Sequence, residues 1–204
     1  YLPTKKRSDM LFLIQADFVP TAGRSDIQDV DWNKWLLKKL GELASEGIDQ
    51  IKEDSSLSKN FYDFIPLKND IHESLMDILC DSMHESLRSK PISKTAFQEW
   101  EIPSKCVLPV SMEIPEIISH KDLPILFGKP LSYIGNDLPE RSLNVLAYLG
   151  SEVLDDILFV EFLSKEDIII THRPEWFLRV YAYLSDVFDV SKAYGGKNSF
   201  NWDN

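Results

Sequence analysis

The sequence predicts an α+β fold in which helices are the majority, with a few short strands near the N-terminus and around residues 95–112. Three observations support this prediction. Hydrophobic residues make up 44% of the 204 residues, which is enough for a folded core. Short apolar runs bounded by proline or aspartate are typical of strands. Longer segments place apolar residues three or four positions apart, as amphipathic helices do.

The first expected element is a buried strand over Met10–Val19, which is rich in apolar and aromatic residues and lies between Asp9 and Pro20. Residues 21–25, Thr-Ala-Gly-Arg-Ser, then predict a turn with a glycine hinge. The N-terminus is therefore expected to run from a strand through a tight turn into a helix.

That helix is predicted over residues 32–46, with Asp29 or Asp31 as its N-cap and Gly47 at its end. Its apolar residues recur at helical spacing: Trp32, Trp35, Leu36, Leu40 and Leu43. A polar connection over residues 49–60 follows.

A second long helix is predicted over residues 70–89, where Pro91 stops it. The short strands expected after it are limited to sheet edges by Pro103 and Pro109, because proline has no backbone N–H. The remaining helices are predicted over residues 115–120, 123–127, 138–150, 152–163 and 174–188.

Residues 168–170, three isoleucines, are ambiguous between strand and helix, and residues 194–204 predict a frayed tail. These elements suggest four segments. They are a strand–turn–helix segment (1–48), a connection (49–60), a helical scaffold with short strands (61–190) and a flexible tail (191–204).

Composition limits the classes of partner. The formal net charge of −11 argues against nucleic-acid binding, which needs clustered Lys and Arg.

Two cysteines, Cys80 and Cys106, make no disulfide framework, so we expect an intracellular protein, cytoplasmic or nuclear. No apolar run approaches the roughly 20 residues that span a bilayer, so no membrane is expected. The start on Tyr1, without a signal peptide, suggests a piece of a longer protein.

The sequence offers little evidence for a metal site. His72, Met76, Cys80 and His84 are spaced four residues apart on one predicted helix, so neighbours share a face. Each step of four drifts by about 40°, so His72 and His84 diverge by about 120°. One helix would supply at most two good ligands, and we expect no metal.

The sequence also lacks recognisable catalytic motifs. There is no Gly-x-Ser-x-Gly elbow, Cys80 lies on an apolar stripe, and Cys106 has no glycine-shaped oxyanion site nearby. The carboxylates that could form pairs lie on solvated helix faces: Asp155, Asp156, Glu161, Glu166 and Asp167. We therefore expect that this chain is not itself an enzyme.

The last helix is aromatic. Trp176, Tyr181 and Tyr183 would form a peptide-binding surface if they were exposed. The alternative is core packing, because Phe177 and Val180 recur with them at helical spacing.

Several N-terminal blocks resemble the segment that follows the ATP-binding domain in sacsin and NO VEIN-like proteins. They are Tyr-Leu-Pro-Thr at 1–4, Leu-Phe-Leu-Ile-Gln-Ala-Asp-Phe at 11–18, Thr-Ala-Gly-Arg-Ser-Asp-Ile at 21–27 and Asp-Trp-Asn at 31–33. Later blocks, at 61–62, 90–92, 100–103 and 175–178, are similar to the helical continuation of this group. The group carries a GHKL nucleotide-binding fold, similar to that of the ninety-kilodalton heat-shock chaperone.

This resemblance implies a middle or transducer segment of a larger chaperone-like ATPase. It implies that Arg24 and Gln28 contact nucleotide phosphates held by a preceding domain. Where the chaperone has a phosphate-contacting arginine this chain has Leu37, with Lys38 and Lys39 beside it, so Lys38 is a further candidate. The ATP-site motifs of the superfamily do not occur here in the right order. ATP and Mg²⁺ would therefore belong to the parent protein, and no cofactor is expected in this chain.

Two alternatives stay open. Arg24 could instead pair with Asp26 or Asp29 and simply order the turn. The whole chain could be a protein–protein interaction scaffold with no ATPase link, which the acidic surface and the aromatic last helix favour. The expected partners are other domains of the parent chain or separate proteins.

Overall fold

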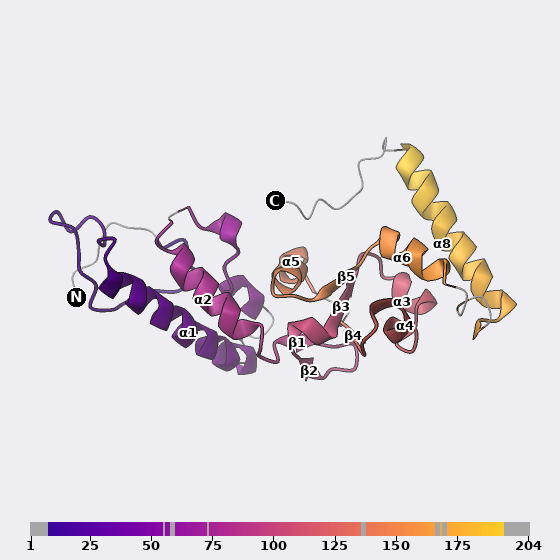
Figure 1. The fold of residues 1–204 in the computed structure, drawn as a ribbon, viewed down its shortest axis with the longest axis horizontal. Helices are drawn as coiled ribbons and strands as arrows, with labels where there is room; N and C mark the ends of the chain where they lie inside the picture. Colours follow the sequence, from indigo (N-terminus) through magenta and orange to yellow (C-terminus); the bar gives the residue numbers. More distant parts are fainter. Residues whose placement is uncertain are drawn as a thin grey trace.

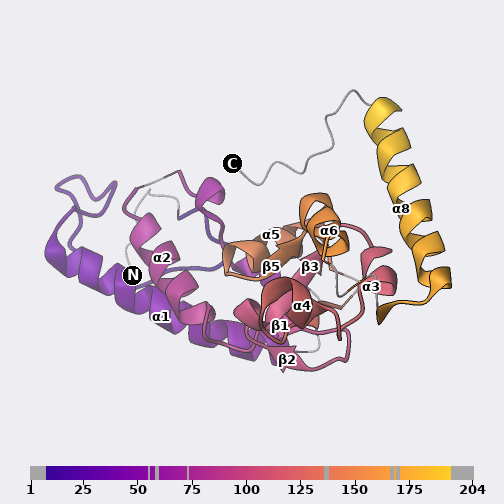
Figure 2. The same ribbon diagram turned by 45° about the vertical axis from the view of Figure 1, so that its right-hand side comes forward.

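The computed structural model describes residues 8–54, 56–57, 60–72, 74–135, 138–165, 168 and 171–193, with side chains as far as Val187. Figure 1 shows an elongated arrangement in which two long helices form one end, a small sheet lies in the middle and the last helix stands at the other end. The rotated view in Figure 2 shows the same order along the molecule. The helix-majority α+β fold that the sequence predicts is confirmed.

Residues 10–19 do not form the strand that we predicted. In the described part of this region, the only strand-like pairing is a single antiparallel bridge between Pro20 and Ile27. The apolar residues of the segment pack on two helices instead of on a neighbouring strand. Met10, Phe12, Ile14 and Phe18 cover a cluster that contains Leu37 and Leu79.

Helix α1 (Asp31–Glu53) is longer than predicted and begins differently. Its N-cap is Val30, not Asp29 or Asp31, and no side chain caps it. The Asp29 carboxylate lies 2.6 Å from the ammonium of Lys34. The helix continues through Gly47, because Ile48 beyond it is buried in the next core cluster and packing there outweighs the low helix propensity of glycine.

Helix α1 packs closely against α2 (Asp77–Leu87), which is shorter than the predicted helix over residues 70–89. A Cβ atom on Gly41 would lie 2.4 Å from the carbonyl oxygen of Leu79. The Ser82 hydroxyl donates to the carbonyl oxygen of Lys38 at 2.8 Å across the same crossing. The glycine therefore lets two helix backbones approach to a distance that no larger residue permits.

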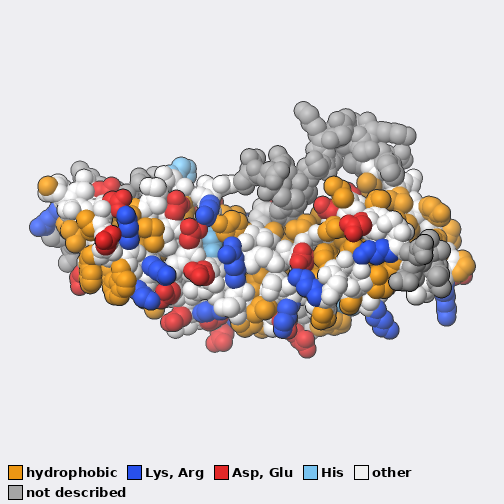
Figure 3. Space-filling view, viewed as in Figure 1, with side chains coloured by type: hydrophobic (Ala, Val, Ile, Leu, Met, Phe, Trp, Pro, Cys, Tyr) orange, Lys and Arg blue, Asp and Glu red, His pale blue; other side chains and the backbone are white. Residues whose placement is uncertain are grey.

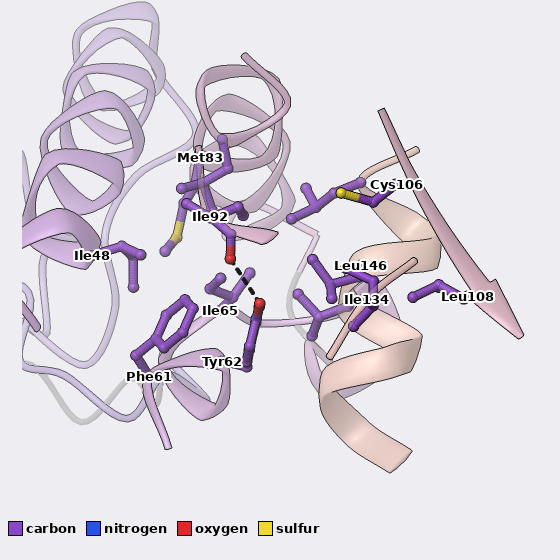
Figure 4. Packing of buried hydrophobic residues seen from close by; sticks show 13 residues of the cluster. Ile48, Phe61, Tyr62, Ile65, Met83, Ile92, Cys106, Leu108, Ile134 and Leu146 are labelled. Atoms are coloured by element: carbon purple, nitrogen blue, oxygen red, sulfur yellow. Dashed lines mark hydrogen bonds between the residues drawn. The ribbon is translucent and has the colours of Figure 1, made fainter. Parts of the chain in front are cut away.

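The central core lies between these helices and the sheet (Figure 4). Two 3-10 turns, Phe61–Phe64 and Lys68–Asp70, connect α1 to α2. The Tyr62 hydroxyl donates to the carbonyl oxygen of Ile92 at 2.7 Å, which satisfies a polar group inside this core.

Two small sheets follow. Strands β1 (Ser93–Lys94) and β2 (Trp100–Glu101) are antiparallel. Strand β3 (Cys106–Pro109) pairs in parallel with both β4 (Ser132–Tyr133) and β5 (Glu152–Leu154). We expected β3 at an edge because of its proline, but it is the central strand, and the proline occupies its last position.

The three-stranded sheet separates two cores. Cys106 and Leu108 face the central core, whereas Val107 between them faces a second core, as the alternation of a strand requires. Helix α5 (Glu140–Tyr148) covers the first face. The second face is covered by α3 (Ile114–Ile117), α4 (Leu123–Phe127), α6 (Asp156–Leu163) and α8 (Pro174–Ala193).

These helices lie where the sequence predicts them, with one exception. The predicted helix over residues 152–163 is wrong at its start, since residues 152–154 form β5. Asp155 then caps α6 by accepting the Leu158 N–H at 2.8 Å. Ile168 is helical, whereas residues 169–170 and the predicted tail from 194 onward lie outside the described residues. In the described ranges, each helix is too short or too polar to cross a lipid bilayer.

Candidate functional site

The loop that joins residues 10–19 to α1 is held by one buried amide. Asn33 is fully buried in the first turn of α1, and its Oδ1 accepts the Val19 N–H at 2.8 Å. Its Nδ2 donates to the carbonyl oxygens of Val19 and Gln28, both at 2.8 Å. The Gln28 N–H in turn bonds the Val19 carbonyl at 2.9 Å. The two ends of the loop are therefore fastened to each other and to the helix.

Arg24 lies on the exposed side of this loop. Its N–H donates to the carbonyl oxygen of Thr21 at 2.8 Å, which closes a turn, and its φ angle is 53°. This left-handed conformation costs a residue with a Cβ about 1–2 kcal/mol. Among the described residues, the Arg24 guanidinium makes no hydrogen bond or ion pair.

The structure argues against the alternative that Arg24 orders the turn through an ion pair. Asp29 is engaged by Lys34. The Asp26 carboxylate accepts the backbone N–H of the next residue, Ile27, at 2.6 Å. The turn is thus held by backbone groups and Thr21, and the Arg24 charge stays available to solvent or to a partner.

Gln28 and Lys38 do not join Arg24 in one cluster of free groups. The Gln28 side-chain amide donates to the carbonyl oxygen of Pro20 at 2.8 Å, so it braces the loop. Lys38 is exposed on α1, and its ammonium has no ion pair within the described chain. Of the three predicted phosphate contacts, only Arg24 and Lys38 have side chains that are free to bind.

Residues 10–19 have the burial pattern of a strand without a partner. Side chains at even positions face the helices and those at odd positions face outward, and Leu11 and Leu13 are 66% and 78% exposed. No backbone N–H from residue 11 to residue 17 has a hydrogen-bond partner in the described chain. Period-two burial with free amides is the state of an open strand edge.

Helix α1 adds an aromatic pair to the same end of the molecule. The rings of Trp32 and Trp35 stack with centroids 5.3 Å apart, and each side chain is 50% exposed. The Trp32 Nε1–H donates to the carbonyl oxygen of Asp17 at 3.0 Å, so the pair lies beside residues 10–19. Leu43, 60% exposed, is on the same helix face. Figure 3 shows hydrophobic side chains gathered over the first half of α1.

The apolar stripe of α1 is thus not the face that packs on α2. The buried face consists of Asn33, Leu37, Gly41, Ser45 and Ile48, whereas Trp32, Trp35 and Leu43 face outward. Periodicity in the sequence located the helix, but the buried side includes small and polar residues that hydrophobicity does not detect. We call residues 10–43, with this outer side, the N-terminal layer.

The aromatic residues of α8 do not form the predicted surface together. Tyr183 is buried, and its hydroxyl donates to Asp156 at 2.8 Å. Trp176 is half-buried, and its Nε1–H donates to the carbonyl oxygen of Ile117 at 2.7 Å. Tyr181 alone of the three faces outward, with 66% of its surface exposed. The prediction of a surface made by all three residues is wrong, because two of them anchor α8 to the core.

The predicted helix that would carry these histidine and cysteine positions begins only at Asp77, so they do not all lie on it. His72 lies before α2 and is exposed, whereas Met76, Cys80 and His84 are buried. Cys80 Sγ lies 3.6 Å from His84 Nδ1, and His84 Nε2 lies 2.6 Å from the Pro66 carbonyl oxygen. Within the described residues, no group of three or more His, Cys, Asp or Glu is placed to hold a metal ion.

Burial makes both thiols weak nucleophiles. It raises the pKa of Cys80 to about 12 and the pKa of Cys106 to about 11, so the reactive thiolate is scarce at neutral pH. Burial also lowers the pKa of His84, which keeps its imidazole neutral. Among the predicted carboxylates, Asp155 caps α6 and Asp156 accepts from Tyr183, whereas residues 166–167 lie outside the described part of the chain.

No protein-family model, curated protein or solved structure matches this chain. The resemblance to sacsin and NO VEIN-like proteins therefore stays a prediction. Sequence reasoning missed Asn33 as the residue that fastens the loop. The sequence contained an indication of this role, because an asparagine in the first helical turn after a glycine-containing loop is well placed to form hydrogen bonds with that loop.

Proposed function

We propose that this chain is a non-catalytic transducer and protein-interaction segment of a larger chaperone-like ATPase. In this proposal the N-terminal layer docks against the nucleotide-binding domain of the parent protein. The observation that carries it is the open outer side of this layer, where apolar side chains, free backbone amides and an unpaired arginine occur together. Each of these three groups is satisfied by contact with another protein surface.

Arg24 has the chemistry to sense a nucleotide held by such a neighbour. A guanidinium binds phosphate oxygens through two parallel N–H donors, and a cation stabilises charge that develops during phosphoryl transfer. The loop that carries Arg24 is fastened to α1 by Asn33, so a force on the arginine reaches the helix directly. Helix α1 packs closely against α2 at Gly41, so a displacement of α1 would also move α2, which borders the central core.

The test uses the full reading frame of the parent, with the preceding domain in place. ATP affinity and turnover are measured for the unmodified protein and for Arg24→Ala, Arg24→Lys and Lys38→Ala. We expect Arg24→Ala to lower turnover by about a hundred-fold or more, the scale seen when one charge-stabilising donor is removed. Arg24→Lys should restore part of the loss, and Lys38→Ala tests the second predicted phosphate contact. Arg179→Ala, which removes an exposed arginine on α8, is the matched control and should leave turnover unchanged. Unchanged turnover in Arg24→Ala would remove its assigned role.

A second candidate is an interaction scaffold with no ATPase link. Exposed apolar side chains at the far end of the molecule favour it: Ile157 and Val160 on α6, and Leu178 and Tyr181 on α8. The same experiment separates the two candidates, since a parent protein that binds no ATP would support only the scaffold.

A further inference from the structure

A small cavity opens where the central strand of the parallel sheet ends. It has a volume of about 50 Å³ and lies between the end of β3, strand β5 and the first half of α5. Its wall is mostly apolar, with Leu108, Val110, Leu143 and Val153 as the hydrophobic lining. Glu140 and Asn144 supply the polar atoms of the lining.

The cavity lies next to the point where the connections from neighbouring strands diverge. In parallel sheets flanked by helices, ligands bind at the carboxyl ends of strands, where the chain leaves neighbouring strands toward opposite faces. Here the chain leaves β3 toward α3 on one face and leaves the adjacent β4 toward α5 on the other. The cavity lies at this end of β3 but on the side of β5, whose Val153 lines it, and its lining includes no residue of β4.

The polar groups of the cavity present uncompensated negative charge. Glu140 and Asn144 are four residues apart on α5 and so share one face. Neither side chain has a hydrogen bond or ion pair with the described residues. Arg141, which lies between them in sequence, does not neutralise Glu140, because its guanidinium is held by Asp70 at 2.7 Å.

A cation is favoured here over an anion. The start of a helix carries about +0.5 of a charge, which opposes a cation, but the full negative charge of Glu140 exceeds it. The net charge of −11 on the whole chain acts in the same direction. One water-sized group needs about 10–15 Å³ of such volume, so the cavity accepts a chain of about three to five heavy atoms.

We propose that this cavity binds a short primary alkylammonium group, with its methylene chain against Leu108 and Val153 and its ammonium at Glu140 and Asn144. A lysine side chain of a partner protein and a free small amine share this chemistry. The site is separate from the N-terminal layer, and it does not depend on the function proposed for that layer.

The test is a titration of the isotopically labelled chain with n-butylamine at neutral pH, followed by amide NMR. Shift changes should be confined to the amides of Leu108, Val110, residues 140–144 and Val153. The neutral analogue n-butanol should bind about two- to five-fold more weakly, the contribution of a partly exposed ion pair. Glu140→Gln should abolish that preference, whereas Glu161→Gln, an exposed carboxylate on α6, should preserve it.

The source of the ammonium is resolved by a second titration with an Nα-acetyl-lysine methylamide. Binding at the same residues identifies a lysine side chain as the occupant, and binding of butylamine alone identifies a free amine. The proposal is overturned if butylamine shifts no resonance at these residues, or if butylamine and butanol bind equally to the unmodified chain.

Discussion

At the scale of single residues, Asn33 decides the geometry of the N-terminal layer. Three hydrogen bonds from one buried amide fix both ends of the loop that presents Arg24. An apolar residue of similar size would leave the Val19 N–H without this partner, whereas the carbonyl oxygens of Val19 and Gln28 would keep the backbone N–H groups of Gln28 and Val30. An unsatisfied buried group costs about 1–3 kcal/mol. The side chain is therefore polar although the position is as buried as Leu37.

His84 makes stability depend on pH. Burial lowers its pKa below the ordinary value of 6.5, so the unfolded chain binds a proton more readily than the folded one. The free energy of unfolding is therefore highest above pH 6.5 and falls as the pH drops from 6.5 toward the lowered pKa of the folded state. Urea unfolding at pH 7.5 and at pH 5.5 measures this loss.

The matched variants for this measurement are His84→Gln and His72→Gln. The first removes the buried imidazole and should reduce the difference in stability between the two pH values. The second makes the same substitution at an exposed histidine and is the matched control. An equal pH difference in the unmodified chain and in His84→Gln would show that another group causes it.

At the scale of elements, two glycines of α1 have opposite roles. A Cβ on Gly41 would meet the backbone of α2, whereas a Cβ on Gly47 would meet nothing within 4 Å. Alanine at Gly47 should stabilise the chain by up to about 1 kcal/mol, the difference in helix propensity. At Gly41 the same gain is outweighed by overpacking, which costs about 1–3 kcal/mol or more. Urea unfolding of Gly41→Ala and Gly47→Ala should shift the two midpoints in opposite directions, and a raised midpoint in Gly41→Ala would refute the close crossing.

The helices were largely predictable from the sequence, because 3.6-residue periodicity and flanking prolines are local signals. Strand β5 was not predictable, because three residues before a capping aspartate are too few to show a periodic pattern. They form a strand only because β3 lies beside them. The Met10–Val19 segment shows the reverse case. Its period-two pattern is real, but a strand also needs a neighbouring strand, which the described chain does not supply.

The candidate sites were less predictable than the helices. Arg24 was identified by resemblance, but its freedom from ion pairs depends on Lys34 engaging Asp29, which residue order alone does not reveal. The cavity at Glu140 and Asn144 arises from residues in β3, β5 and α5 that meet only in the folded chain.

At the scale of the whole molecule, the described residues form three packed clusters. The helices and strands that carry them follow one another along one long axis (Figure 1). The central one joins α1 and α2 to the sheet, and the outer two support exposed apolar surfaces at opposite ends. Such an arrangement suits a segment that connects a neighbour at one end to a partner at the other. The central claim is that the N-terminal layer is a docking surface.

Hydrogen exchange at the amides of residues 11–17 tests this claim most directly. In the isolated chain these amides should exchange rapidly, because they have no hydrogen-bond partner in the described structure, whereas amides in the middle of α1 should exchange slowly. In the full parent protein we expect strong protection of residues 11–17 with little change in α2. Equally rapid exchange of residues 11–17 in the isolated chain and in the parent would contradict it.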